Sequence, residues 1–311
     1  MRLRTLLLAV AVAAIAAGGA GGAVAKLKGK ISADGSSTVG PYARSAAELF
    51  RRAHPAVQIT VGISGTGGGF QRFCNGEIDL ADASRAIKAA EIQACQKNNI
   101  KWVAFTIAND GITLVVNKQN TWANCLTVAQ LKRIWEPGSK VDNWNQVDAS
   151  FPNQKLKLFG AGTDSGTFDF FTEAIVGKAR ASRSDYAATE NDNVTVEGVA
   201  GEKGALGYFG LSYYEENRSR LKAVKIDGGR GCVAPNKKTV QKNTYRPLSR
   251  PLFIYAKRTS FQRPEVRAFI GFILQNERRI AQRSRFVSLT NNQLKNSREH
   301  YRTVLKLVRR D

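Results

Sequence analysis

Three segments rich in Gly, Ser and Thr have the composition of anion-binding loops. They occupy residues 35–38, 64–69 and 162–167, each after a strand-like run and before a helix-like run. A helix N-terminus presents unpaired N–H groups and a partial positive charge, glycine lets a ligand approach the backbone closely, and hydroxyl groups add donors. One such loop is typical of an ordinary capped helix. Three of them predict a cage for one dehydrated oxyanion.

A cation follows a fourth strand-like run. Ser84-Arg85 comes shortly after residues 78–81, which have the composition of a buried strand. A guanidinium group presents a planar fork of N–H donors that fits phosphate oxygens. We therefore interpret Arg85 as the fixed countercharge of the anion. The alternative is an ordinary solvated surface arginine.

These loops need a scaffold that places several strand ends together. Residues 28–33, 57–63, 111–117 and 155–159 have strand-like patterns that alternate with helix-like segments. Such alternation predicts an α/β architecture. With 311 residues the chain has the length of two domains, and it contains no Pro-rich or Ser-rich linker. Two lobes would therefore be joined by strands rather than by a flexible tether.

The composition excludes several kinds of protein and site. Hydrophobic residues make up 43% of the chain, which is enough for a large core and argues against wholesale disorder. The chain has two His and four Cys, and the Cys have no close C-x-x-C spacing. The usual ligand patterns of zinc sites are therefore missing, and we expect neither a metal nor a cofactor.

The first 25 residues have the pattern of an export signal. Arg2 and Arg4 precede an apolar run at residues 6–17, and an A-x-A motif ends at Ala25. A transmembrane helix is the alternative, but it needs about 20 apolar residues. No Cys follows the cleavage point directly, so we expect no lipid anchor. The sequence thus predicts an exported protein, periplasmic or at the cell surface.

The chain is strongly basic, with a formal net charge of +22. The signal contains two Arg and no acidic residue, so its removal would lower the charge to +20. A charge of this size attracts nucleic acid, anionic cell-wall polymers and small oxyanions alike. Export argues against a nucleic-acid partner. The simplest interpretation is a solvated basic surface.

Four Cys in an oxidising compartment predict two disulfides, with free buried Cys as the alternative. Three connectivities are possible. Cys74 and Cys95 flank one strand-like segment, whereas Cys125 and Cys232 lie far apart in the chain. We favour Cys74–Cys95 together with Cys125–Cys232.

A series of short motifs runs from Gly35 to about Lys257. In chain order they are Gly35-Ser36-Ser37-Thr38, Ser64-Gly65-Thr66-Gly67-Gly68-Gly69-Phe70, Asp79 with Ala83-Ser84-Arg85, Asp110-Gly111-Ile112, Leu126-Thr127-Val128, Ile134-Trp135, Gly162-Thr163-Asp164-Ser165-Gly166-Thr167 and Gly204-Ala205-Leu206-Gly207-Tyr208-Phe209. In number and order these motifs resemble the phosphate-binding proteins of bacterial phosphate ABC importers.

The resemblance implies an α/β protein with the two-lobed type II periplasmic-binding-protein fold, whose ligand cleft lies between the lobes. Lobe one would comprise residues 26–114 and 254–311, and lobe two residues 115–253, with both disulfides inside single lobes. The chain would cross between the lobes near Leu114 and near Phe253-Ile254-Tyr255. The implied function is high-affinity capture of inorganic phosphate outside the membrane by a monomer that delivers it to an ABC permease.

The resemblance also assigns ligand contacts, which come from both lobes. Some relatives carry an Arg before the Ser-Gly-Thr motif, where this chain has small residues around Gly162, so we infer that Arg85 supplies the only positive charge. The residues expected to bind phosphate are Thr38, Val39 through its N–H, Ser64, Thr66, Gly67, Ser84, Arg85, Asp110, Ser165, Gly166 and Thr167.

Discrimination against sulfate needs a carboxylate that accepts the proton of hydrogen phosphate, because sulfate carries no proton at neutral pH. Some relatives place this carboxylate where Ser84 stands. In this chain the candidates are Asp110, Asp82 and Asp164, in that order. Each of them could instead be a helix cap or a turn residue.

Two other functions are compatible with parts of the sequence. Asp164-Ser165-Gly166 resembles a serine-hydrolase nucleophile, but a triad needs a base in reach, and neither His54 nor His300 lies in a supporting motif. We therefore expect no enzyme. The net charge would also suit a wall- or surface-binding protein of the same fold, and another oxyanion could replace phosphate.

Overall fold

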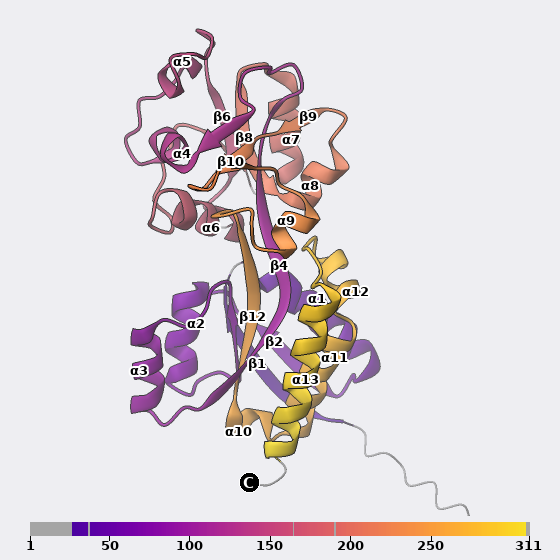
Figure 1. Cartoon of the computed structure of the whole chain (residues 1–311). Helices are drawn as coiled ribbons and strands as arrows, with labels where there is room; N and C mark the ends of the chain where they lie inside the picture. The colour runs from indigo at the N-terminus through magenta and orange to yellow at the C-terminus, as the bar shows by residue number, and fades with distance from the viewer. Residues whose placement is uncertain (1–26, 37, 164, 190, 309–311) are drawn as a thin grey trace, which may run out of the picture.

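A computed structural model describes residues 27–308 of the chain, apart from Ser37, Asp164 and Glu190. The predicted export signal at residues 1–25 lies outside the described residues. The molecule consists of two lobes, one above the other, with strands passing between them (Figure 1). In the described part of the chain no helix has the length and apolar character needed to cross a membrane.

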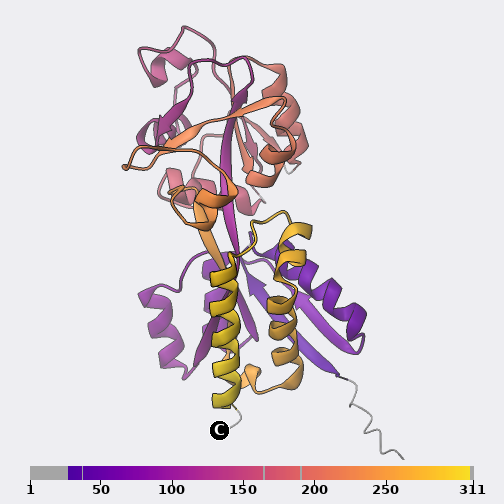
Figure 2. The ribbon, with the colours of Figure 1, turned by 45° about the vertical axis from the view of Figure 1, so that its right-hand side comes forward.

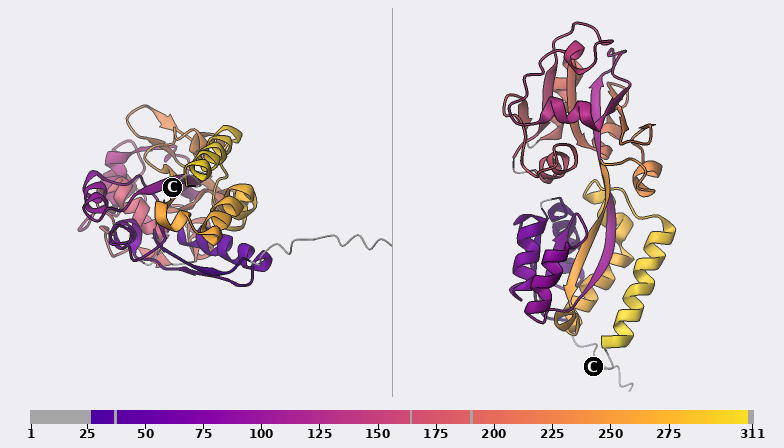
Figure 3. Two further views of the ribbon diagram at one scale, coloured as in Figure 1. Left: turned by 90° about the horizontal axis from the view of Figure 1, so that it is seen from below. Right: turned by 60° about the vertical axis from the view of Figure 1, so that its left-hand side comes forward.

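Two long strands hold the lobes together. Strand β4 (Trp102–Asn117) pairs antiparallel with β12 (Ser249–Lys257) along its first part and with β8 (Ala205–Gly210) along its last part. One sheet therefore runs through both lobes. Its strand order is β2 (Val57–Val61), β1 (Gly29–Gly35), β3 (Leu80–Ala83), β12, β4, β8, β6 (Lys157–Ala161) and β7 (Ala187–Thr189), and β9 (Leu221–Ala223) also pairs with β4. Figure 3 shows the two strands as the bridge between the lobes.

Lobe one contains the N-terminal strands and both terminal helical regions. Its parallel strands β1, β2 and β3 each lead into a loop and then a helix, which is the arrangement expected for α/β units. Apart from β4 and β12, the elements of this lobe are β1 (Gly29–Gly35), α1 (Gly40–Ala53), β2 (Val57–Val61), α2 (Gly65–Cys74), β3 (Leu80–Ala83), α3 (Ala89–Lys97), α10 (Arg258–Phe261), α11 (Pro264–Gln275), α12 (Glu277–Arg283) and α13 (Asn291–Val308).

Lobe two contains the middle of the chain. A small sheet in the order β11-β10-β5 lies beside the main sheet. The elements are β5 (Cys125–Thr127), α4 (Val128–Trp135), α5 (Trp144–Val147), β6 (Lys157–Ala161), α6 (Gly166–Ile175), β7 (Ala187–Thr189), α7 (Asp192–Gly201), β9 (Leu221–Ala223), β10 (Lys225–Asp227), β11 (Cys232–Val233), α8 (Leu211–Glu216) and α9 (Lys237–Gln241).

Each lobe has its own apolar core. The core of lobe one includes Phe50 and Phe269, and the core of lobe two includes Trp135 and Phe171. All four side chains are essentially inaccessible to solvent. Burying one such side chain contributes about 1.5–3 kcal/mol, so each lobe is stabilised largely on its own. The core of lobe two also takes in Ile112, which the sequence-based division assigns to lobe one. The exact lobe boundaries stay a prediction.

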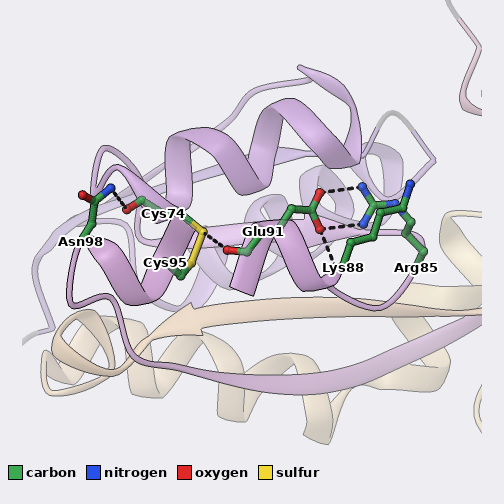
Figure 4. The surroundings of a disulfide bond; sticks show 6 residues. All are labelled: Cys74, Arg85, Lys88, Glu91, Cys95 and Asn98. Atoms are coloured by element: carbon green, nitrogen blue, oxygen red, sulfur yellow. Dashed lines mark hydrogen bonds and ion pairs between the residues drawn. A yellow bond between two sulfur atoms is a disulfide. The ribbon is translucent and has the colours of Figure 1, made fainter. Parts of the chain in front are cut away.

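Both predicted disulfides are confirmed. Cys74–Cys95 joins the end of α2 to α3, and Cys125–Cys232 joins β5 to β11. Neither bridge connects the two lobes, so neither restricts their relative movement. In Figure 4 the Cys74–Cys95 bridge and Arg85 lie on opposite sides of Glu91.

Candidate functional site

The first loop ends β1 and begins α1. Gly35 has a φ of +144°, and a Cβ there would lie 2.1 Å from the carbonyl oxygen of Asp82, so only glycine fits. The Ser36 N–H donates to that oxygen at 2.8 Å, which ties the ends of β1 and β3 together. Thr38 and Val39 follow, both buried. The Val39 N–H is already directed at the Ser36 Oγ, at 3.4 Å.

The second loop, before α2, meets the end of β3. Thr66 Oγ1 and Ser84 Oγ are 3.0 Å apart, and the Ser84 N–H also donates to Thr66 Oγ1 at 3.3 Å. These two predicted site residues therefore hold each other in place. Ser64 behaves differently, because its hydroxyl donates to the Asp34 carboxylate at 3.0 Å. That bond turns Ser64 toward lobe one and away from the space between the lobes.

Arg85 is held by a carboxylate of its own lobe. Its two terminal nitrogens donate to the two oxygens of Glu91, at 2.7 and 2.8 Å, as Figure 4 shows. Glu91 lies in the first turn of α3 and also accepts from the Lys88 N–H at 2.8 Å. Because the Cys74–Cys95 bridge holds α3 against α2, it indirectly fixes Glu91 and Arg85. The charge of Arg85 is thus compensated within the protein.

The third loop comes from lobe two and touches the first. Ser165 caps α6, its Oγ accepting from the Thr167 N–H at 3.1 Å. The carbonyl oxygen of Gly166 accepts a 2.9 Å hydrogen bond from the hydroxyl of Thr38. The first and third loops, 128 residues apart in sequence, therefore meet directly between the lobes.

Arg250, at the start of β12, reaches the same point. One of its terminal nitrogens donates to Thr38 Oγ1 at 2.8 Å, and its guanidinium carbon lies 3.4 Å from the centre of the Phe170 ring. Such cation–π contacts are worth more when both groups are desolvated. Asp110, opposite Arg250 across the β4–β12 pair, brings a carboxylate oxygen to 3.6 Å from its Nε.

This cation is buried and incompletely bonded. The Arg250 side chain is 11% exposed, and its Nε–H has no hydrogen-bond partner among the described residues. Burial lowers the pKa of Arg250 to about 10, which keeps the guanidinium charged at neutral pH. Burial also raises the pKa of Asp110, an effect that the nearby Arg250 opposes. A buried cation with a spare donor is the kind of group that binds an anion.

Two hollows flank Thr38, which lines both of them. The α2-side hollow, of about 270 Å³, is also lined by the predicted residues Thr66, Gly67, Ser84 and Arg85, together with Arg250. The α12-side hollow, of about 340 Å³, is lined by the predicted residues Asp110, Ser165, Gly166 and Thr167. The two hollows thus contain nine of the eleven predicted contacts, and Ser64 and Val39 lie outside both.

The three candidate proton acceptors have different places. Asp110 lines the α12-side hollow. Asp82 lines neither hollow; its carboxylate is buried without a hydrogen-bond partner in the described chain, and burial together with the negative charge of Asp34 raises its pKa to about 8. A carboxyl group that is protonated at neutral pH is a poor acceptor. Asp164 lies outside the described residues.

Arg250 is the site residue that the sequence did not reveal. It is one of 47 Lys and Arg residues and lies outside the motifs that pointed to the loops. The available signal was its position next to Pro251-Leu252-Phe253, an uncharged run in the strand predicted to cross between lobes. A cation at the start of a buried strand requires a partner.

The site offers little to a metal ion. In the regions that the structure covers, no group of three His, Cys, Asp or Glu side chains is placed to hold one. The hydroxyls, backbone N–H groups and guanidinium groups around Thr38 are donors to anions rather than ligands of cations. Carboxylates also line the hollows, namely Asp110 and Asp192 on the α12 side and Asp169 and Glu173 on the α2 side. The arrangement can bind a small oxyanion from both lobes at once.

Comparison with known proteins identifies the family of the chain. A family model described as a PBP superfamily domain matches residues 20–277. Protein SphX of Synechococcus elongatus is 46% identical over 262 residues, which span 83% of this chain and 77% of SphX. The phosphate-binding protein PstS of Staphylococcus haemolyticus is 40% identical over 266 residues, 84% of this chain and 82% of that protein.

Solved structures agree as well. A crystal structure described as a possible phosphate binding protein from Planctomyces limnophilus has a TM-score of 0.86 at 46% identity, covering 90% of this chain and 99% of that one. An ABC-type phosphate transport receptor from Vibrio cholerae shares the fold, with a TM-score of 0.66 at 22% identity over 84% of this chain and all of that one. The chain belongs to the PBP superfamily and, within it, to the family of PstS phosphate-binding proteins.

Proposed function

We propose that the protein binds inorganic phosphate between its lobes and delivers it to an ABC permease. The observation that carries the proposal is the meeting at Thr38 of three parts of the molecule. The Thr38 hydroxyl of lobe one accepts from the buried cation Arg250 of β12 and donates to the Gly166 carbonyl oxygen at the N-terminus of α6 in lobe two. Family membership supports phosphate as the anion. The proposed role is binding and release, with no chemical step.

In the proposed complex, phosphate replaces contacts that the lobes now make with each other. The Thr38 hydroxyl and the Arg250 Nη2–H group would turn from their present partners to phosphate oxygens, and the free Nε–H of Arg250 would gain an acceptor. Ser84, Thr66 and Arg85 would approach from lobe one. Donors from both lobes would then stabilise the closed arrangement, since each lobe is rigid.

The charged groups near Thr38 differ from the expectation that Arg85 supplies the only positive charge for the anion. Arg85 and Arg250 each have a carboxylate partner, Glu91 and Asp110 respectively. The Arg85–Glu91 pair is bidentate, whereas the Arg250–Asp110 contact is 3.6 Å long and leaves a donor unused. We propose that Arg250 is the main countercharge and that Asp110 accepts the proton of hydrogen phosphate.

Native mass spectrometry of the purified protein and calorimetric titration test the proposal together. We expect one phosphate per protein in the native mass spectrum and one-to-one binding in calorimetry, with sulfate much weaker. A protein that binds no phosphate but binds another oxyanion tightly would contradict it. Hydrolysis of a phosphate ester that is lost in Ser165→Ala would contradict the non-catalytic role.

The cellular setting is also part of the proposal. The export signal at residues 1–25, cleavage near Ala25 and a place outside the cytoplasmic membrane rest on the sequence pattern. A monomer is expected because one chain supplies donors from both lobes. Mass spectrometry of the protein secreted by its own host would identify the mature N-terminus and the mass of the native species.

A further inference from the structure

We propose that a basic groove on lobe one binds a linear polyanion with closely spaced phosphate groups. The groove lies where the end of α11 and the start of α12 meet α13, helices that Figure 2 shows together on one side of lobe one. It encloses about 610 Å³, more than either hollow beside Thr38. Its charged lining residues are Arg278, Arg279, Lys295, Arg298 and Arg302.

The positive charges of this groove lack close carboxylates. Arg279 and Arg302 are exposed and make no hydrogen bond or ion pair with a described residue. Arg298 donates to the backbone carbonyls of Leu274 and Gln275 at 3.0 and 3.3 Å, which fixes its place without neutralising it.

The two remaining cations of the groove are no better compensated. Arg278 bonds the side-chain amide oxygen of Asn291, which is uncharged. Lys295 has only a 3.9 Å contact with Glu299, one turn along α13. All five groups thus keep their positive charge available to a ligand.

Several other arginines of the same lobe are paired, although Arg44 and Arg51 of α1 are exposed and bond no described residue. Arg52 and Arg283 share Glu48, at 2.7 and 2.8 Å, and Arg285 bonds Glu216 of lobe two. The groove therefore differs from an ordinary solvated basic surface, in which acids and bases alternate. It concentrates five cations around one concave space.

One acidic residue lies beneath the groove. Glu277 is fully buried at the start of α12, and its carboxylate accepts a 2.7 Å hydrogen bond from the Leu289 N–H in the protein interior. Burial raises the pKa of Glu277 to about 7, while Arg278 and Arg298 oppose that shift. Glu277 does not line the groove, so a bound anion would face the cations and not this carboxylate.

The number and type of these groups indicate the class of ligand. One phosphate dianion would neutralise two of five charges, so several anionic groups in a row fit better. Guanidinium forks suit phosphate oxygens, and the amides of Gln275, Asn276 and Asn291 offer further donors. The only apolar lining residue is Leu294, which is buried, so the described lining has no aromatic platform for bases and no apolar group to enter a membrane.

The groove and the candidate phosphate site share no lining residue. Polyanion binding can therefore be measured while inorganic phosphate saturates the interlobe site. We would follow the binding of an end-labelled inorganic polyphosphate of defined length to the full protein by fluorescence anisotropy, over a series of salt concentrations and with excess inorganic phosphate throughout.

The test variant is Arg279→Gln/Arg302→Gln, because neither side chain supports the fold through a bond to a described residue. The matched control is Lys97→Gln/Arg230→Gln, which changes net charge equally at exposed positions that bond no described side chain and lie outside the groove. We expect the groove variant to bind polyphosphate at least about tenfold more weakly, with a salt dependence reduced by about two charges. The control should stay within about twofold of the parent.

Three results would overturn the proposal. Equal losses in the groove variant and the control would show that net charge alone attracts the polyanion. Tighter binding of a thymidine oligonucleotide of the same charge, with greater dependence on the groove, would identify nucleic acid as the partner. Tighter binding of phosphatidylglycerol vesicles, again with greater dependence on the groove, would identify a membrane surface as the partner. Calorimetry with inorganic phosphate should be unchanged in the groove variant, which separates a failure here from a failure of the proposed phosphate site.

Discussion

The hydroxyl of Thr38 donates a 2.9 Å hydrogen bond to the carbonyl oxygen of Gly166, and this bond joins the two lobes at the centre of the candidate site. The same hydroxyl accepts from Arg250 at 2.8 Å. Thr38 therefore contacts lobe two and the connecting strand β12 and lines both hollows. A ligand that enters here must compete with, and then replace, contacts between the lobes.

Replacing Thr38 tests this position. Thr38→Val keeps the shape but removes the hydroxyl, and a hydrogen bond to a charged group contributes about 1.5–3 kcal/mol. We expect phosphate affinity, measured by calorimetry, to fall by about one to two powers of ten. Thr60→Val, at an exposed position of β2, is the matched control and should bind like the parent. Parent-like binding by Thr38→Val would place the anion elsewhere.

The two arginines should differ in importance. Arg85 is already bound by both oxygens of Glu91, so Arg85→Ala should weaken phosphate binding by about one to two powers of ten. Glu91→Gln should retain binding, because it keeps Arg85 and removes only the competing charge. If Arg85→Ala abolished binding while Arg250 remained, Arg85 would be the main countercharge after all.

Asp110 should control selectivity more than affinity. Asp110→Asn keeps the size of the side chain but removes its ability to accept a proton as a carboxylate. We expect the ratio of phosphate to sulfate affinity to fall by about tenfold or more, since a hydrogen bond to a charged acceptor contributes about 1.5–3 kcal/mol. Competition calorimetry with both anions measures this ratio. An unchanged ratio would contradict the proposed role of Asp110 and leave Asp164 as the candidate proton acceptor.

The two disulfides should stabilise the protein unequally. Their Cys lie 21 and 107 residues apart, and the entropy removed from the unfolded chain grows with loop length. On that basis Cys125→Ala/Cys232→Ala should lower the free energy of unfolding by about 4 to 5 kcal/mol, and Cys74→Ala/Cys95→Ala by about 3 kcal/mol. Urea denaturation measures both. The reverse order would show that native-state contacts outweigh loop entropy.

Asp82 should make stability depend on pH. Its folded-state pKa of about 8 lies above that of an unfolded Asp, about 3.9, so the folded protein binds the extra proton between these values. Stability should therefore fall as the pH rises from about 4 to 8. Asp82→Asn should flatten this fall, as measured by urea unfolding at several pH values, whereas exposed Asp142→Asn should not. Identical slopes in parent and Asp82→Asn would contradict the assignment.

The sequence was sufficient to predict the loops and the disulfides. The loops 35–38, 64–69 and 162–167 each follow a strand, and the ends of parallel strands meet at one edge of a sheet, so their proximity within a lobe was predictable. The contact between Thr38 and Gly166 was not predictable by this reasoning alone. It depends on how β4 and β12 set the two lobes against each other.

Other details depend on partners that lie outside the predicted motifs. Ser64 is a residue type that suits an anion contact and lies in a predicted loop, yet its hydroxyl donates a hydrogen bond to the Asp34 carboxylate. Arg85 has the right type, yet Glu91 compensates it. The role of Arg250 follows only from the register of the β4–β12 pair, which places it opposite Asp110. In each case the role of the side chain is decided by a neighbour outside the motif that carries it.

The most direct test of the account is calorimetric titration of inorganic phosphate into Arg250→Gln/Asp110→Asn. The double substitution removes the buried pair together, so neither charge is left uncompensated, and a thermal unfolding midpoint near that of the parent would show that the protein is folded. We expect phosphate affinity to fall by at least two powers of ten, because the buried cation beside Thr38 is gone. Parent-like affinity in this folded variant would contradict the assignment of the phosphate site.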